Sequence, residues 1–202
     1  MNDEEMKSLF HNLKNDLASM TSLLNLHKLY KDSIEPEELL NRLFERQIII
    51  ATAYEKLYQE GDYPWVGLIN FINELLSREG RTLTSYSHNV NIRKEIPDIR
   101  LPVKRLTPLA QILVELLSNS YRHAFTAEQE SPTIFFRITE EEDRLKLGYE
   151  DNGTGLPAEF NHKKSRTLGM QFINALSRQL GGKPEFNSPE GGGMSFSLDV
   201  KK

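Results

Sequence analysis

The chain reads Asp151-Asn-Gly153-Thr-Gly155-Leu-Pro157 directly after Arg144 to Glu150, a segment whose alternating polar and apolar residues predict a β-strand. Two glycines at positions i and i+2 permit a turn with positive φ and let a flat ligand approach the backbone closely. The carboxylate of Asp151, at the end of the strand, is placed to accept a hydrogen bond from an exocyclic amine. An ordinary turn opened by Asp-Asn-Gly has the same residues, so this stretch alone leaves both interpretations open.

A cluster of polar residues lies upstream, on a segment from Pro108 to Ala124 that predicts a strong helix. The cluster consists of Glu115, Asn119, Arg122 and His123, at positions i, i+4, i+7 and i+8. We therefore expect all four side chains on one helical face. An amide oxygen suits Mg²⁺, and a guanidinium suits phosphate oxygens. A polar face that is merely solvated is the competing interpretation, and the cluster taken alone favours it.

A third cluster, Thr167-Leu168-Gly169, begins a predicted helix from Leu168 to Leu180. Free backbone N–H groups at a helix N-terminus, together with the positive end of the helix dipole, receive phosphate groups. The alternative is a capped helix start with an incidental glycine. The sequence holds no G-x-x-x-x-G-K-[ST] phosphate loop, no H-E-x-x-H zinc pair and no G-x-S-x-G nucleophile elbow. Nucleotide binding would therefore have to use a different design.

Helices and strands alternate around these clusters. A further helix is predicted from Trp65 to Ser77. Strands are predicted at Asn89 to Glu95, Thr133 to Thr139, Arg144 to Glu150 and Ser195 to Val200. The acidic turn Glu140 to Asp143 joins two of these strands into a hairpin. This order predicts an α+β fold, a two-layer α/β sandwich in which helices cover one face of a mixed sheet.

The first sixty residues have a different pattern, with apolar side chains at the alternating three- and four-residue spacing of a helix with one narrow apolar stripe. The first stripe comprises Met6, Phe10, Leu13, Leu17, Met20 and Leu24, and the second comprises Leu40, Leu43, Gln47, Ile50, Tyr54 and Leu57. Ser33-Ile34-Glu35-Pro36 separates them, because proline suits the first turn of a new helix. The pattern predicts an antiparallel hairpin of two helices of roughly 25 residues.

Two helices alone leave much of each apolar stripe in water. Pairing two hairpins into a four-helix bundle would bury both stripes, so we expect a homodimer through this region. The alternative is a hairpin that docks on its own downstream domain. All 12 glycines and eight of the nine prolines lie beyond residue 60, and this change in composition predicts two domains, residues 1–62 and residues 63–202.

Composition excludes several classes of protein. The 202 residues include no cysteine, which excludes a thiolate zinc site, a disulfide framework and a cysteine nucleophile. The formal net charge of −4 disfavours binding to nucleic acid or to an anionic membrane surface. The longest apolar run, Ile48 to Ala51, is far too short to span a bilayer. We therefore expect a cytoplasmic location without direct membrane contact from this chain.

Taken in chain order, the clusters that contain Asn119, Asp151 and Gly169 resemble the N, G1 and G2 boxes of the ATP-binding fold shared by gyrase, the ninety-kilodalton heat-shock chaperones, MutL-type repair proteins and histidine kinases. The resemblance covers roughly residues 65 to 200. It implies a site for ATP and Mg²⁺ in which Asn119 helps hold the metal and Asp151 reads the adenine amino group. It further implies that residues 157 to 167 form a mobile lid. The remaining nucleotide-site residues that it implies are Arg122, His123, Gly153, Gly155, Thr167, Leu168 and Gly169.

The N-terminal hairpin indicates which branch of that fold is present. The run His11-Asn-Leu-Lys14-Asn15-Asp-Leu17 is similar to the H-R-V-K-N-N-L phosphoacceptor helix of one subfamily of bacterial sensor histidine kinases. The resemblance implies ATP-dependent autophosphorylation of His11, followed by phosphoryl transfer to an aspartate of a response regulator. By the same analogy Glu115 orients the reacting groups or removes a proton from them. The identity of the general base is left open.

The chain departs from the family pattern at several positions. Asp16 stands where the motif usually has Asn, Arg122 replaces a common Lys, and Met194 replaces a usual Thr in the late glycine run Gly191 to Phe196. A non-catalytic phosphotransfer or adaptor protein with a decayed ATP-binding domain is therefore an alternative, although the intact Asn119 and Asp151 argue against it. A third candidate is an ATPase or serine kinase that acts on a partner protein, and the His11 motif argues against that.

Overall fold

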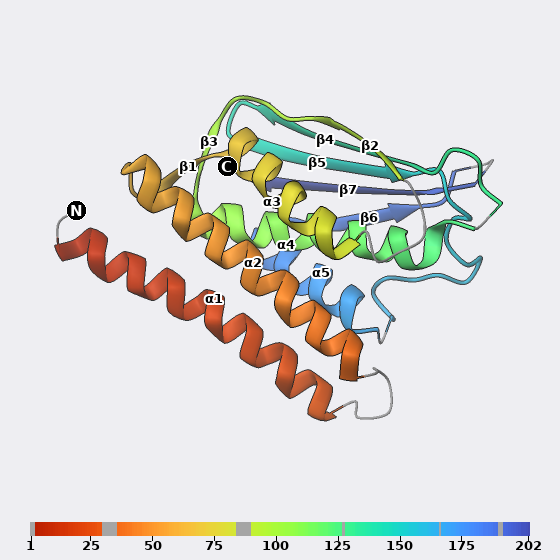
Figure 1. Ribbon diagram of the computed structural model, residues 1–202, viewed down its shortest axis with the longest axis horizontal. Coiled ribbons are helices and arrows are strands. Elements are labelled where there is room, and N and C mark those ends of the chain that lie inside the picture. Colours follow the sequence, from red (N-terminus) through yellow and green to blue (C-terminus); the bar gives the residue numbers. More distant parts are fainter. Residues whose placement is uncertain (1–2, 30–35, 84–89, 127, 166, 190–191) are drawn as a thin grey trace. The chain divides into compact units, whose positions relative to one another are not determined.

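The computed structural model describes residues 3–29, 36–83, 90–126, 128–165, 167–189 and 192–202 (Figure 1). It divides into two compact units, which are described separately. Unit 1 comprises Met1–Glu79 and Ile99–Gln111, and unit 2 comprises Gly80–Asp98 and Ile112–Lys202. The chain passes between the units after Glu79, after Asp98 and after Gln111, the last of these within helix α4 (Val103–Asn119). The division into functional domains after residue 62 stays a prediction.

Unit 1 begins with two long helices, α1 (Asp3–Leu29) and α2 (Pro36–Glu60), which run side by side in opposite directions (Figure 1). Acidic residues occupy the first turn of α1, where they complement the positive end of the helix dipole. Helix α2 starts at Pro36, the position at which proline costs no hydrogen bond. The predicted hairpin is confirmed, while residues 33–35 of the predicted break lie outside the described residues.

The predicted helix from Trp65 to Ser77 is wrong at its beginning. Residues Trp65–Gly67 form strand β1, which pairs antiparallel with β3 (Arg100–Pro102), and helix α3 begins only at Leu68 and extends to Leu83. The strand depends on a partner more than thirty residues away, so the local apolar spacing could not reveal it. At its end, the backbone N–H of Gly67 donates to the Glu60 carboxylate at 3.1 Å.

A polar cluster inside unit 1 links α1, α2 and the beginning of α4. The Tyr54 hydroxyl donates to Asp16 Oδ2 at 3.1 Å, and the Thr107 hydroxyl lies 3.0 Å from Asp16 Oδ1. Thr107 Oγ1 also lies 3.2 Å from the Val103 carbonyl oxygen, to which it can donate instead. Burial raises the pKa of Asp16, an effect that these two hydrogen bonds only partly oppose.

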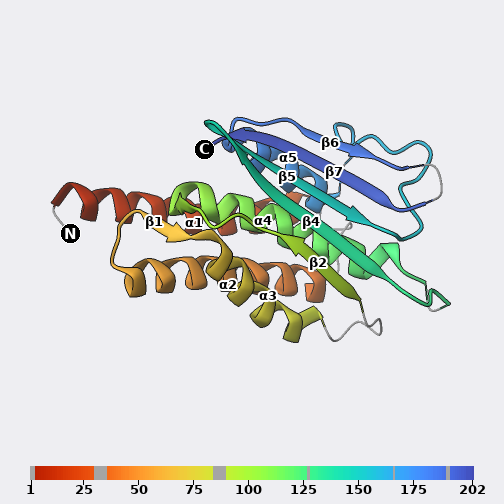
Figure 2. The ribbon, with the colours of Figure 1, turned by 90° about the horizontal axis from the view of Figure 1, so that it is seen from above.

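Unit 2 contains a five-stranded sheet in the order β2-β4-β5-β7-β6. The strands are β2 (Asn91–Glu95), β4 (Thr133–Glu141), β5 (Arg144–Asp151), β6 (Pro184–Asn187) and β7 (Met194–Lys201). Only β2 and β4 are parallel, and the other neighbours are antiparallel. The C-terminal half of α4 and helix α5 (Leu168–Gln179) cover one face (Figure 2). The α+β prediction and its β4–β5 hairpin are confirmed.

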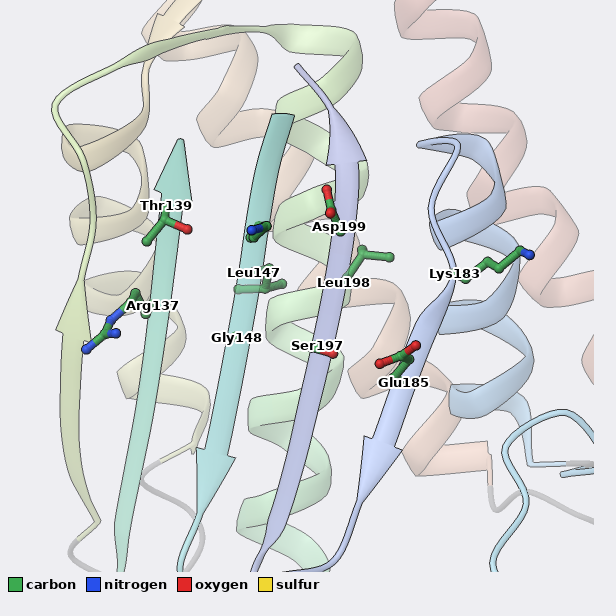
Figure 3. A pocket seen from close by; sticks show the side chains of 10 residues that line it. Arg137, Thr139, Leu147, Gly148, Lys183, Glu185, Ser197, Leu198 and Asp199 are labelled. Carbon is green, nitrogen blue, oxygen red and sulfur yellow. The ribbon is translucent and has the colours of Figure 1, made fainter. Parts of the chain in front are cut away.

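Alternation along the strands explains why one face of the sheet is covered. The side chains that point towards the helices are apolar and buried: Ile134, Phe136, Ile138, Leu145, Leu147, Tyr149, Phe196, Leu198 and Val200. The opposite face is polar and carries a shallow depression of 470 Å³ whose lining includes Arg137, Lys146, Lys183 and Asp199 (Figure 3). Several charges on this face are paired, as in the 2.7 Å contact between Arg144 and Asp199.

Helix α4 starts five residues earlier than predicted, at Val103, and contains Pro108. Proline lacks the N–H that would bond to the Lys104 carbonyl. The helix nevertheless continues, because Leu106, Leu109 and the apolar residues that follow are fully buried along it. Its end also differs from the prediction, since a π-helical turn, η1 (Ser120–Ala124), follows Asn119. Strand β6 was not predicted, because four residues beginning with proline give too weak a pattern.

Candidate functional site

Asp151 lies at the end of β5 in unit 2, and its side chain is buried. Its Oδ1 accepts hydrogen bonds from the backbone N–H groups of Gly153 at 3.0 Å and Met194 at 3.2 Å. Its Oδ2 accepts from the Ser120 hydroxyl at 2.6 Å. An ionised carboxylate has about four acceptor positions, so Asp151 retains capacity for one further donor.

A hydrogen-bonded chain behind Asp151 fixes the direction of its carboxylate. The Tyr149 hydroxyl donates to Ser120 Oγ at 2.9 Å and also lies 3.3 Å from the Leu116 carbonyl oxygen. Complete burial raises the pKa of Tyr149 well above its ordinary value, so the phenol stays a neutral donor. Sequence analysis missed Ser120 and Tyr149. Tyr149 carried a usable signal, since it lies two residues before Asp151 and so on the same face of the strand.

Glycines bring three backbone segments together beside Asp151. A Cβ on Gly153 would overlap the Ala124 carbonyl group, and one on Gly193 would overlap the Asp151 carbonyl oxygen. The backbone N–H of Gly193 donates to the Gly153 carbonyl at 2.7 Å, and that of Thr154 donates to the Ala124 carbonyl at 2.8 Å. The turn after β5, the turn before β7 and the end of η1 are thus held in direct backbone contact.

Gly155 has the positive φ that the sequence predicted, +81°. A side chain there would overlap Ser188. The Ser188 hydroxyl accepts from the Leu156 N–H at 3.2 Å and donates to the Gly193 carbonyl at 2.9 Å. Ser188 therefore joins the two glycine-containing turns, a role that sequence analysis did not predict.

The predicted polar cluster lies at the end of α4 and in η1, the turn that also contains Ser120. Glu115 is buried, Asn119 is half-buried, and Arg122 and His123 follow in η1. Because a π-helical turn is wider than an α-helical turn, the α-helical spacing assumed for Arg122 and His123 is wrong. Asn119 Nδ2 is buried without a hydrogen-bond partner in the described part of the chain. Such an orphaned amide is costly unless a ligand or water meets it.

The N-terminus of α5 shows the arrangement expected for an anion. Thr167 is the N-cap residue, in extended geometry, and its side chain makes no capping hydrogen bond. The hydroxyl of Thr167 instead lies 3.0 Å from Ser165 Oγ. Leu168 and Gly169 are the first helical residues, and both are buried. The N-terminus of α5 therefore has backbone N–H groups that do not donate to a capping side chain.

His11 lies on α1 in unit 1, and its side chain is exposed. The amide nitrogen of Asn15, four residues later on the same helix, lies 3.2 Å from His11 Nδ1. This pair depends on the tautomer of the imidazole and on the direction of the amide. His11 and the polar sites of unit 2 thus belong to different compact units.

Two further observations limit the chemistry of the described residues. They contain no group of three or more His, Asp or Glu side chains that could hold a metal ion. A divalent ion at Asn119 would therefore need most of its ligands from a bound phosphate compound and water, as is usual for Mg²⁺. Within the described ranges, no helix is long and apolar enough to cross a membrane.

Two family models match the chain in the order of its two structural patterns. Residues 9–82 match the model described as histidine kinase. Residues 105–202 match the model described as histidine kinase-, DNA gyrase B-, and HSP90-like ATPase. The first match includes His11, and the second includes Asn119, Asp151 and Gly169.

Known sensor kinases resemble nearly the whole chain. The sensor histidine kinase PdtaS of Mycolicibacterium smegmatis is 26% identical over 98% of this chain and 40% of that protein. PdtaS of Mycobacterium tuberculosis is 28% identical over 89% of this chain and 36% of that protein. The chain therefore spans well under half the length of these relatives.

A solved structure has the same fold. The histidine kinase domain of the Erythrobacter litoralis EL346 blue-light activated histidine kinase superposes with a TM-score of 0.71, covering 98% of this chain and 91% of that domain at 16% identity. A helical hairpin matching one kinase model, an ATPase-type sandwich matching the other and relatives named as sensor kinases lead to one conclusion. The chain belongs to the histidine kinases and has the two matched parts of a histidine kinase catalytic core.

Proposed function

We propose that this chain autophosphorylates His11 from ATP with Mg²⁺ and then passes the phosphoryl group to an aspartate on the receiver domain of a response regulator. The observation that carries the proposal is the surroundings of Asp151, where a buried carboxylate with one acceptor position left lies among close-packed glycine turns. Such a site suits a planar base with an exocyclic amine. The exposed His11 supplies the acceptor in the other unit.

The residues around Asp151 fit a nucleotide in several respects. The Asp151 carboxylate accepts from the adenine amino group, and Gly153 and Gly155 let the adjoining turn pack closely against Ala124 and Ser188 beside it. The uncapped start of α5, at Thr167, Leu168 and Gly169, receives phosphate oxygens. This division of roles would account for all three sequence clusters.

Asn119 and the residues that follow it fit the metal and the phosphates. When bound, Mg²⁺ would offset the negative charge of the phosphates. The amide oxygen of Asn119 would be a ligand of the ion, and its Nδ2, which has no partner among the described residues, would donate to a phosphate oxygen or to water. Arg122 and His123 are proposed to contact the phosphates. Glu115 is proposed to orient these groups from its buried position in α4. Its role as a general base stays open.

Asn15 is proposed to select the nucleophilic nitrogen of His11. If the Asn15 amide turns so that its oxygen accepts from Nδ1–H, the lone pair of the outer nitrogen Nε2 is free. Nε2 then forms the bond to the γ-phosphorus while the bond from phosphorus to the leaving oxygen of ADP breaks. No proton has to be removed before the bond forms, because Nδ1–H stays on the ring during the transfer and is released to water afterwards. The reaction therefore does not require an acidic residue next to His11. The expected product is phosphohistidine at Nε2.

The hairpin is proposed to form a homodimer as a four-helix bundle, which also presents His11 to the response regulator. Apolar side chains stay exposed on both helices, including Phe10 at 62%, Leu17 at 51% and Phe44 at 57%. A second copy of the hairpin would remove this apolar surface from water. Because the reaction consumes ATP, we also propose a cytoplasmic location. No observation favours the non-catalytic adaptor.

Intact mass after incubation with ATP and Mg²⁺ tests the proposal. We expect one added phosphoryl group that brief acid treatment removes, and none in His11→Gln. His88→Gln is the matched control, because it changes a histidine outside the proposed acceptor motif and outside the proposed nucleotide site. An acid-stable phosphoryl group, or one that persists in His11→Gln, would contradict autophosphorylation of His11.

A further inference from the structure

Residues 157–165, which connect the turn after Asp151 to the start of α5 near Thr167, are called the lid segment. It has no helix or strand and instead forms two consecutive turns. The N–H of Phe160 donates to the Pro157 carbonyl at 2.8 Å, and the N–H of Ser165 donates to the Asn161 carbonyl at 3.0 Å. These turns give the segment a defined local shape, but they do not attach it to the rest of unit 2.

Aromatic side chains provide one attachment. The ring of Phe160 meets the ring of Phe186 edge-on, with centroids 5.7 Å apart, and the His162 ring lies 5.3 Å from that of Phe186. Phe186 in turn packs against Phe196 at 5.0 Å, its partner across β6 and β7. The lid segment thus covers the apolar side of β6, the edge strand of the sheet.

A pair of hydrogen bonds provides the second attachment. The Nδ1 atom of His162 lies 3.0 Å from Asn174 Oδ1, and Asn174 Nδ2 donates to the His162 carbonyl at 2.9 Å. Because Oδ1 can only accept, the His162 ring carries its proton on Nδ1. One amide side chain on α5 therefore holds both the ring and the backbone of the same residue.

We propose that the His162–Asn174 pair is a pin that positions the lid segment for nucleotide binding, with His162 and Asn174 acting as positioning residues. The inference rests on the proposed function, since it assumes that ATP occupies the site beside Asp151 and the start of α5. Asn174 lies on α5, the helix whose N-terminus is proposed to receive the phosphates. The pin therefore ties the lid segment to the element that contacts the nucleotide.

The pin strengthens ATP binding because it restricts the lid segment before the nucleotide arrives. A segment of nine residues that is already attached loses less conformational freedom when a ligand orders it. Release of the pin should weaken ATP binding and leave the phosphoryl transfer step unchanged, because neither residue contacts the reacting groups.

Amide hydrogen exchange of the full chain without nucleotide tests the pin itself. In His162→Ala we expect exchange in residues 157–165 to accelerate by about fivefold, since the ring loses its hydrogen bond to Asn174 and its contact with Phe186. His162→Asn should restore slow exchange, because an Asn amide offers a donor near the position of Nδ1. Glu159→Ala, an exposed change in the same segment, is the matched control and should exchange at the original rate.

The nucleotide measurement uses the same variants. The Kd for ATP with Mg²⁺ should rise about fivefold in His162→Ala and in Asn174→Ala, and no further in the double variant. The rate of autophosphorylation at saturating ATP should stay within about twofold of the original. If the His162–Asn174 pair only stabilised the fold, its loss would lower the rate of autophosphorylation by reducing the amount of folded protein. Recovery of the original Kd for ATP in His162→Asn would exclude that explanation.

Each negative result has a separate meaning. Unchanged exchange in His162→Ala would overturn the pin, whatever the nucleotide measurement gives. Faster exchange with an unchanged Kd for ATP would overturn its positioning role. Failure of the unmutated chain to bind ATP would overturn the proposed function instead, a result that the exchange experiment does not depend on.

Discussion

Unit 1 and unit 2 each contain a carboxylate that is largely withdrawn from water, and the two are held by different kinds of donor. Asp16 accepts from two hydroxyl groups, of Tyr54 and Thr107. Asp151 accepts from two backbone N–H groups and from a serine hydroxyl that is itself held by a tyrosine. A hydroxyl can rotate and become an acceptor, whereas a backbone N–H cannot. The structure therefore predicts that Asp16 tolerates exchange for a neutral amide and that Asp151 does not.

The largest expected effect follows from Asp151→Asn. The new amide nitrogen would face the Ser120 hydroxyl, which already accepts from Tyr149, and would meet the adenine amino group as a second donor. We expect the Kd for ATP to rise by about 100- to 1,000-fold, because buried donors are left unpaired. Calorimetric titration with ATP measures this. Asp199→Asn, on the opposite face of the sheet, is the control and should bind normally.

A smaller effect is expected from Gly193→Ala, which tests the backbone contacts around Asp151. The position combines a φ of +84° with a Cβ that would overlap the Asp151 carbonyl oxygen. We expect a loss of about 3 kcal/mol in the free energy of unfolding, from strain and overlap together.

Gly61→Ala provides the matched comparison in unit 1. Gly61 also has a positive φ, +64°, but nothing lies within 4 Å of the position that a Cβ would take there. Strain alone should cost about 1 kcal/mol. Urea unfolding followed by circular dichroism compares the two variants, and equal losses would show that the close approach at Gly193 contributes nothing.

The smallest effect is expected from Asp16→Asn and depends on pH. Because burial raises the folded-state pKa of Asp16 above its ordinary value of 3.8, the folded chain holds this proton more tightly than the unfolded chain does. The contribution of Asp16 to stability is therefore fully present below pH 3.8 and is lost as the pH rises through the raised value.

Asp16→Asn should remove this dependence. The amide nitrogen can donate to Thr107, whose hydroxyl then donates to the Val103 carbonyl, and the amide oxygen still accepts from Tyr54. We expect a gain of up to about 1 kcal/mol at pH 7. Urea unfolding at pH 4 and pH 7 measures the gain. A variant less stable than the original at pH 7 would contradict the view of Asp16 as replaceable.

Sequence reasoning succeeded where the signal is local. The apolar spacing of α1 and α2, Pro36 and the alternation along β4, β5 and β7 are each visible within a short window, and the structure confirms these elements. Strands β1 and β3 could not be predicted, because each has only three residues and is defined by pairing with the other.

The candidate site was predicted only in part, because only some of its residues have a local signal. Asp151 and its glycines are recognisable by type and spacing, but the Tyr149–Ser120 support arises only when β5 packs against η1. The π-helical turn after Asn119 has no local signature that periodicity could detect. Nor could spacing show that Asn174, twelve residues beyond His162, holds the lid segment.

The short strand β1 has a spectroscopic consequence. It begins with Trp65, the single tryptophan of the chain, which is 41% exposed and belongs to unit 1. Its indole fluorescence therefore reports on β1 and its pairing with Pro102, whereas the proposed nucleotide site in unit 2 contains only tyrosine as an intrinsic fluorophore. Excitation beyond the tyrosine absorption band therefore reports on unit 1 without any label, because Trp65 is the only indole in the chain.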